Sequence, residues 1–172
     1  MLKGKDLSLR EYQKSDLPKV QSLLNNVSAG FDLKRGAGVP LTEHEVEAIM
    51  TKNQGPDVFR YIALDLADVV VGIFEVRLAA KDRRAELEHR MLEEHRMKGH
   101  DTEALKVILN ILFNELNMNR CQTIIFDFEK IAFETFRNLG FTKEAALRHH
   151  VYHENSYHDA HVLGLLKDEY LK

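Results

Sequence analysis

One helical segment constrains the fold more than any other part of this chain. From Thr102 to Leu116, apolar side chains recur at helical spacing and cover most of the helix surface. Such a helix must be packed on several sides, inside the layered core of a domain. The segment before it, Arg84 to Leu92, predicts a strand with an unusually polar sequence. The chain therefore joins a polar strand to its most apolar helix through a short loop.

The remaining segments predict a β-α-α-β-β-β-α-β-α-β-β order of elements. Apolar alternation or apolar runs predict strands over Leu7–Arg10, Phe59–Leu64, Val69–Val76, Arg84–Leu92, Cys121–Phe126, Phe141–Tyr152 and Ala160–Leu166. Besides the helix at Thr102, helices are expected from Asp16 to Val27, from the capping-box pattern at Thr42 to Met50, and from Lys130 to Gly140. The order indicates a domain that mixes helices and strands throughout.

Composition indicates one folded domain over residues 1–172. The chain is 44% hydrophobic and 30% charged with only three prolines, which excludes long-range disorder. Its 24 basic and 27 acidic residues give a net charge of -3, so no nucleic-acid partner is expected. No window approaches the ~18 apolar residues of a membrane helix, so no membrane partner is expected either. The one cysteine, Cys121, cannot form an internal disulfide, and we expect a cytoplasmic protein.

The loop from Arg96 to Asp101 has the features of an anion-binding site. A helix N-terminus offers unpaired backbone N–H groups and the positive end of the helix dipole. Arg96 and Lys98 supply cations just before it, and Gly99 lets the backbone approach a ligand closely. An ordinary polar connection would have the same composition, so these residues alone leave phosphate binding and a plain loop as alternatives.

Several spaced motifs resemble the GNAT superfamily of acetyl-CoA-dependent N-acetyltransferases. Arg96 and Gly99 match its Gln/Arg-x-x-Gly-x-Gly/Ala loop, between the fourth strand and the third helix. Arg83-Arg84-Ala85-Glu86 and Phe136-Arg137-Asn138-Leu139-Gly140-Phe141 are similar to motifs of the branch that holds ribosomal-protein N-terminal acetyltransferases and spermidine acetyltransferases. The resemblance covers nearly the whole chain. It implies an α/β (α+β) fold of the GNAT type, with a mixed central sheet of about six to seven strands and helices on both faces.

The resemblance also implies an activity and its site residues. The protein would move an acetyl group from acetyl-CoA to a primary amine: a protein N-terminus, a polyamine or another small amine. The residues implied to contact acetyl-CoA are Met91, Leu92, Arg96, Met97, Lys98, Gly99, His100, Asp101, Thr102, Glu129 and Phe136. We expect the segment from Met91 to Thr102 to line the main cleft, beside a gap between the fourth and fifth strands.

Proton transfer needs a base, and Glu86 is the predicted one, acting through water. Strand alternation puts Glu88 on the same face as Glu86. The alternative for both glutamates is a surface ion pair with a neighbouring arginine, Arg84 or Arg90.

Three departures from the family pattern define a second hypothesis. Asp101 stands where the loop closes on glycine or alanine, Glu129 replaces a cofactor-contacting asparagine, and Phe136 replaces the tyrosine often proposed as general acid. The Asp101 carboxylate either turns away from the helix start or takes the place of a phosphate there. The alternative function is a degenerate GNAT fold with weak or no acetyl-CoA binding, acting as a binding or regulatory module. Tyr152 and Tyr157 are either substitute acids or cross-strand packing.

The acceptor, the metal content and the oligomeric state are less constrained. In the family the acceptor is recognised by the variable region Ser28–Lys52 and by the last hairpin. Carboxylates in that region favour a cationic amine if they face the acceptor entrance, and a solvated acidic helix face is the alternative. These carboxylates are Asp32, Glu43, Glu45 and Glu47. Five of the nine histidines lie between His149 and His161, without an established zinc spacing, so no metal site is predicted. Pairing through the last strands would give a homodimer.

Overall fold

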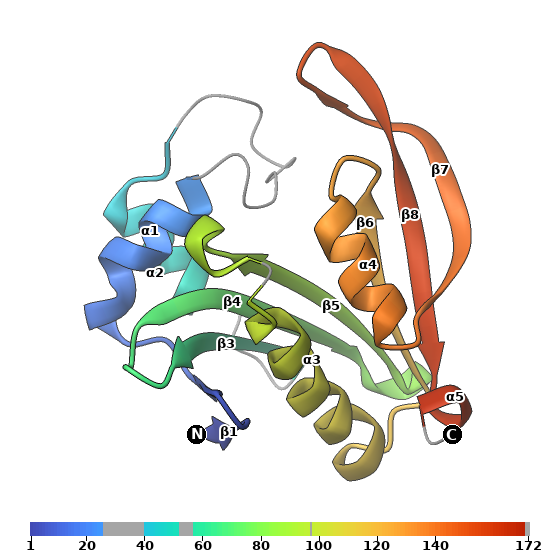
Figure 1. The fold of residues 1–172 in the computed structure, drawn as a ribbon, viewed down its shortest axis with the longest axis horizontal. Helices are drawn as coiled ribbons and strands as arrows, with labels where there is room; N and C mark the ends of the chain where they lie inside the picture. Colours follow the sequence, from blue (N-terminus) through green and yellow to red (C-terminus); the bar gives the residue numbers. More distant parts are fainter. Residues whose placement is uncertain (26–39, 52–56, 97, 171–172) are drawn as a thin grey trace. The chain divides into compact units, whose positions relative to one another are not determined.

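A computed structural model describes residues 1–25, 40–51, 57–96 and 98–170 of the chain. Its strands are β1 (Leu2–Lys3), β2 (Leu7–Arg10), β3 (Val58–Asp65), β4 (Val70–Ala79), β5 (Arg84–Met91), β6 (Arg120–Phe126), β7 (Thr142–His153) and β8 (Ser156–Leu166). Its α-helices are α1 (Leu17–Asn25), α2 (Glu43–Thr51), α3 (His100–Asn110), α4 (Lys130–Asn138) and α5 (Lys167–Tyr170) (Figure 1). Hydrogen-bonded strands follow the order β1-β2-β3-β4-β5-β6-β8-β7 in one mixed sheet, which confirms the predicted mixed α/β fold.

The structure differs from the predicted elements in three places. The described sheet has eight strands rather than six to seven, because the two-residue strand β1 pairs with β2 and is too short to show alternation. The most apolar helix begins at His100, two residues before the predicted start, which puts Asp101 inside its first turn. After Asn110 this helix continues as a π-helical turn, η5 (Ile111–Glu115), rather than as a regular α-helix.

Tertiary contacts divide the chain into two compact units. The first unit comprises Met1–Val76 and His89–Val107, and the second comprises Arg77–Glu88 and Ile108–Lys172. The expectation of a single domain over residues 1–172 stays a prediction. Within the described ranges, no helix has the length and apolar character that crossing a bilayer requires.

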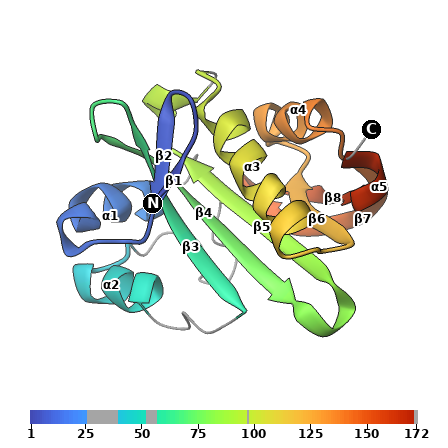
Figure 2. The ribbon, with the colours of Figure 1, turned by 90° about the horizontal axis from the view of Figure 1, so that it is seen from below.

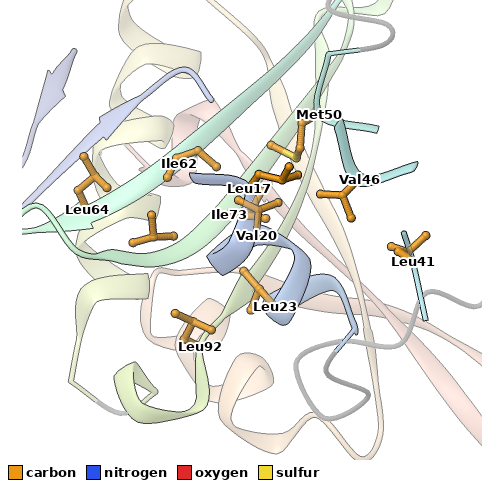
Figure 3. Close-up of a cluster of buried hydrophobic side chains, with 11 residues drawn as sticks. Leu17, Val20, Leu23, Leu41, Val46, Met50, Ile62, Leu64, Ile73 and Leu92 are labelled. Atoms are coloured by element: carbon orange, nitrogen blue, oxygen red, sulfur yellow. The ribbon is translucent and has the colours of Figure 1, made fainter. Parts of the chain in front are cut away.

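In the first unit, α1 and α2 cover one face of β3 and β4, and α3 begins on the other side of these strands (Figure 2). The helices and strands share a buried cluster, drawn in Figure 3, whose members are Leu17, Val20, Leu23, Leu41, Val46, Met50, Ile62, Leu64, Val70, Ile73 and Leu92. Burying an aliphatic side chain of this size contributes about 1.5–3 kcal/mol, so this cluster is the main stabilising contact of α1 and α2. The predicted capping box opens α2: the Glu45 carboxylate accepts the Thr42 N–H at 2.8 Å.

A buried ion pair fastens β2 to the turn before α1. Both guanidinium nitrogens of Arg10 donate to the Asp16 carboxylate, at 2.7 and 2.8 Å, and Asp16 also accepts the Gln13 N–H at 2.8 Å. Only 5% of Asp16 is exposed. Burial alone would raise the pKa of Asp16, but the hydrogen bonds from Arg10 and Gln13 outweigh it and hold that pKa below its ordinary 3.8.

In the second unit, β8 lies between β6 and β7. The antiparallel β6–β8 register runs from Arg120–Leu166 to Phe126–Ala160. The parallel β5–β6 register joins Arg84 to Arg120 and ends at Glu86 and Gln122. Helix α4 ends at Asn138, and Gly140 follows just past its C-terminus, as predicted, with a φ of +94° that favours glycine.

The ion pair of β2 gives a stability prediction with a pH signature. Asp16→Asn is expected to lower the free energy of unfolding at pH 7 by about 2 kcal/mol, because it weakens charge-assisted hydrogen bonds of a buried group. A carboxyl whose folded pKa is depressed stabilises the fold above its unfolded pKa, and this contribution is lost as pH falls through the folded pKa. Urea unfolding at pH 7, 5 and 3 should therefore show the wild type and the variant converging only below the ordinary pKa of 3.8.

Glu11→Gln is the matched control, since Glu11 is exposed beside the same arginine and its side chain takes no part in the pair. It should change stability by no more than about 0.5 kcal/mol. An Asp16→Asn variant as stable as the wild type at pH 7 would contradict the assignment.

Candidate functional site

The predicted loop lies in the first unit, between the end of β5 and the start of α3. Met91 and Leu92 are buried, and the Leu92 N–H donates to the Val71 carbonyl of β4 at 3.0 Å. These two residues therefore anchor the loop through side-chain packing and one backbone bond. A 3₁₀ turn, η4 (Glu93–His95), follows, and Met97 lies outside the described residues.

Gly99 forms the entrance to helix α3. Its φ is +83°, and no atom lies within 4 Å of the position that a Cβ would take. The Gly99 carbonyl accepts the Glu103 N–H at 3.0 Å, so the amides of residues 100 to 102 come before the first hydrogen bond of the helix. A backbone this open, at the positive end of a helix, fits the diphosphate of acetyl-CoA.

Two cationic side chains, Arg96 and Lys98, come just before the start of α3. Lys98 is exposed, and the Arg96 guanidinium lies 3.2 Å from the Glu93 carboxylate. That surface pair contributes little stability, so Arg96 can exchange a carboxylate for a phosphate oxygen at small cost. The residues present therefore fit a doubly charged phosphate group, except for the carboxylate of Asp101.

Asp101 follows neither of the two expected alternatives completely. Its side chain is directed inward, with only 6% of the residue exposed, so it does not extend into solvent. Its Oδ1 atom accepts the Thr102 N–H at 2.7 Å, which occupies one of the amides at the helix start. The carboxylate thus removes one donor and adds a negative charge, while it leaves the space beside Gly99 open.

The sequence predictions do not include His89, a half-buried histidine that interacts with the charge of Asp101. His89 stacks on Phe74, with ring centroids 5.6 Å apart. Burial lowers the pKa of His89 to about 4, against the opposing charge of Asp101, and nearby Arg96 lowers it further. His89 is therefore neutral at pH 7. The signal was in the sequence: on β5 the inward positions are Ala85, Leu87, His89 and Met91, one strand face at a spacing of two.

The predicted base lies in the second unit, on the opposite face of β5. Glu86 is half-buried and has no salt-bridge partner among the described residues. Glu88 is ion-paired with Arg77 of β4, not with Arg84 or Arg90. The ion-pair alternative thus holds for Glu88, and the role of Glu86 as a base stays a prediction.

The other two departures from the family pattern also lie in the second unit. Glu129 precedes α4, and its Oε2 accepts the Phe126 N–H at 2.9 Å, which tightens the turn after β6. Phe136 is fully buried and packs edge-on against Phe141, with ring centroids 4.9 Å apart. A structural role is thus observed for each residue, and contact with acetyl-CoA stays a prediction for both.

The tyrosines of the last hairpin pack against each other. Tyr152 and Tyr157 are register partners on β7 and β8, with ring centroids 5.1 Å apart, as the cross-strand alternative requires. A bulge between Leu147 and Val151 interrupts the alternation of β7, so strict alternation does not assign faces to His149 and His150. In the part of the chain that the structure describes, no group of three or more His, Cys, Asp or Glu residues could hold a metal ion.

The geometry of Asp101 predicts its effect on acetyl-CoA, the ligand that the resemblance implies. Asp101→Gly frees the Thr102 N–H and removes one negative charge, so it should tighten acetyl-CoA binding about ten-fold, a change of ~1.4 kcal/mol. It should also lower the melting temperature, because the carboxylate no longer caps the helix. Calorimetric titration measures the first effect and thermal unfolding the second. As a control, Glu94→Gln removes an exposed charge from the same loop and should change the affinity for acetyl-CoA by less than about two-fold. Equal affinity of the wild type and Asp101→Gly for acetyl-CoA would refute the prediction.

Comparisons with known proteins give the same family as the motifs. The model of the family described as "Acetyltransferase (GNAT) domain" matches residues 9–162. The chain is 24% identical to the SPbeta prophage-derived N-acetyltransferase YokL of Bacillus subtilis, over 97% of this chain and 93% of the relative. It is 26% identical to a spermidine N(1)-acetyltransferase of Escherichia coli, over 96% of this chain and 88% of the relative.

Solved structures extend the likeness to the fold. A spermidine N-acetyltransferase of Vibrio cholerae, in complex with CoA and spermine, superposes with a TM-score of 0.84 at 22% identity, covering 97% of this chain and 99% of the other. The predicted GNAT fold is therefore confirmed. Since the family match spans most of the sequence, this chain belongs to the GNAT acetyltransferase family and is an N-acetyltransferase whose co-substrate is acetyl-CoA.

Proposed function

We propose that this acetyltransferase acts on a primary amine of a small cationic acceptor, a polyamine of the spermidine class. The observation that carries the proposal is the match to a spermidine N(1)-acetyltransferase along 96% of the chain. The structural relative whose title names CoA and spermine covers almost the same range. A peptide N-terminus remains the second acceptor class, and the cytoplasmic location and a homodimer remain predictions.

Charge on helix α2 supports a cationic acceptor in part. Glu43 is exposed in the first turn of the helix and has no salt bridge with another described residue. Glu47 lies 3.6 Å from Lys14, an exposed pair that a stronger cation can replace. Glu45 is committed to the capping box, and Asp32 lies outside the described residues. Two of the four carboxylates thus remain able to attract a polyamine by long-range charge.

The chemistry requires a neutral amine. Glu86 accepts a proton from the acceptor ammonium through water, and the freed nitrogen attacks the thioester carbonyl carbon. The C–N bond forms, the C–S bond breaks, and the CoA thiolate leaves and takes up a proton. Backbone amides at the start of α3, with Lys98 and Arg96, hold the diphosphate and orient the thioester for this attack.

The second hypothesis is a degenerate GNAT module with weak acetyl-CoA binding. The hydrogen bond from the Thr102 N–H to Asp101 favours it, because that amide is not available to a phosphate. The open space at Gly99 and the exposed Lys98 favour the enzyme, because neither feature serves the packing of the loop.

The base assignment predicts a pH-dependent loss. Glu86→Gln should lower kcat by about a hundred-fold near pH 7. The loss should shrink as pH rises toward the pKa of the amine, because solvent then supplies the neutral acceptor. The Kd of acetyl-CoA should stay unchanged. Steady-state kinetics from pH 6 to 10 measure this, with Glu88→Gln as the control, expected within about three-fold of wild type since Glu88 belongs to an exposed ion pair. An equal loss at every pH would assign Glu86 a structural role instead.

The acceptor assignment predicts an order of substrates. The kcat/KM for spermidine should exceed that for a lysine-free peptide with a free N-terminus by at least ten-fold, and glutamate should not react. The spermidine value should fall with added salt, since steering by Glu43 and Glu47 is screened. If only the peptide is acetylated, the polyamine proposal is wrong but the protein is still an acetyltransferase. If calorimetry detects no binding of acetyl-CoA, the degenerate GNAT module is the better hypothesis.

A further inference from the structure

A serine, a histidine and an aspartate line up at the end of the last hairpin, within the second unit. The Ser156 Oγ lies 2.8 Å from Nε2 of His158, and Nδ1 of the same ring lies 2.8 Å from Oδ1 of Asp127. Ser156 and His158 come from β8, and Asp127 directly follows β6. No local sequence motif points to this cluster, because Asp127 and His158 are 31 positions apart in the chain.

The acceptor and donor roles follow from chemistry. An ionised carboxylate only accepts hydrogen bonds, so Nδ1 of His158 carries a proton and donates it to Asp127. With the proton on Nδ1, Nε2 is an acceptor. The Ser156 hydroxyl has two acceptors within reach, Nε2 of His158 at 2.8 Å and the His153 carbonyl at 3.3 Å, and the shorter contact favours donation to Nε2. Each ring nitrogen therefore has the partner that a serine nucleophile requires: the hydroxyl on Nε2 and the orienting carboxylate on Nδ1.

The aspartate is held firmly and stays ionised. Its second oxygen, Oδ2, accepts the Asp159 N–H at 3.1 Å, so both carboxylate oxygens are engaged. Burial alone would raise the pKa of Asp127, but the hydrogen bonds from Asp159 and His158 bring it below its ordinary value. Phe128 packs edge-on against the His158 ring, with centroids 5.0 Å apart, and restricts its rotation. The histidine is thus oriented on two sides.

The hydroxyl of Ser156 is not needed to close the turn. His153 and Ser156 are register partners across a two-residue loop, Glu154 and Asn155, whose φ values are +46° and +63°. Both positive values are those of the tight turn that matches strand twist. The backbone therefore closes the hairpin without the hydrogen bond of 3.3 Å from the Ser156 hydroxyl to the His153 carbonyl. Ser156 is also exposed, and a small ester can reach it.

We propose that Ser156, His158 and Asp127 form a second acyl-accepting site, which takes an acyl group from an activated ester or thioester and passes it to water. Ser156 Oγ attacks the carbonyl carbon as its proton moves to Nε2 of His158. The bond to the leaving alcohol or thiol breaks, and that group takes the proton from Nε2. Water then attacks the acyl-serine, again losing a proton to His158, which releases the carboxylic acid and restores Ser156. The net reaction is ester plus water to acid plus alcohol.

The test uses the full chain with p-nitrophenyl acetate, in the absence of acetyl-CoA and amine. The result of this test is therefore independent of whether the proposed transfer of acetyl groups to amines is correct. The wild type should show a burst of p-nitrophenol and should react stoichiometrically with diisopropyl fluorophosphate at Ser156, as peptide mass spectrometry locates. Ser156→Ala should lose the burst and the label, and Asp127→Asn should lower the acylation rate about a hundred-fold.

Two controls separate this site from general surface reactivity. Ser22→Ala removes an exposed serine of α1, in the other unit, and should leave label and rate unchanged. Circular dichroism should give Ser156→Ala the spectrum and melting temperature of the wild type. If Ser156→Ala hydrolyses the ester as fast as wild type, or if the wild type acquires no label on Ser156, the proposal is overturned. In the first case a histidine side chain would hydrolyse the ester without a serine nucleophile.

Discussion

The alternation of strand β5 determines where the functional groups of this protein lie. One face of the strand is inward, and it carries Ala85, Leu87, His89 and Met91. The other face carries Glu86 and Glu88, which explains why the strand is so polar in sequence. A shift of register by one residue would exchange these faces, burying two carboxylates and exposing the apolar set. The cost of burying unpaired carboxylates therefore keeps Glu86 on the accessible face.

The charges of Asp101 and His89 affect how the start of α3 can bind an anion. Desolvation lowers the pKa of half-buried His89 to about 4, so no imidazolium compensates the charge of the Asp101 carboxylate at pH 7. Asp101 instead turns inward and accepts the N–H of the next residue. This arrangement leaves Gly99 open while it adds negative charge where a phosphate would bind. A GNAT loop with aspartate in place of glycine or alanine can thus keep its backbone shape. Its affinity for an anion is nevertheless lower than that of a loop with glycine or alanine.

The last hairpin combines packing and chemistry in one structure. Tyr152 and Tyr157 pair across β7 and β8, while Ser156 and His158 share the side that meets Asp127 after β6. Antiparallel pairing of β6 with β8 makes this possible, since it brings the end of one strand beside the start of the other. Residues that are unremarkable along the chain become a connected network only through that pairing.

Local patterns in the sequence were sufficient to predict the family, the order of elements and the loop before α3. Helical spacing, the capping box at Thr42 and the glycine at position 140 are local signals, and their physics acts within a few residues. Contacts between distant segments could not be predicted in this way. Asp101 lies near enough to His89 of β5 for their charges to interact, and the Ser156–His158–Asp127 network depends on the pairing of β6 with β8. Burial of Phe136 and the ion pair of Glu88 with Arg77 belong to the same class. These features follow from the tertiary structure, because desolvation and hydrogen bonding depend on which groups meet in space, and residues far apart along the chain carry no local pattern that pairs them.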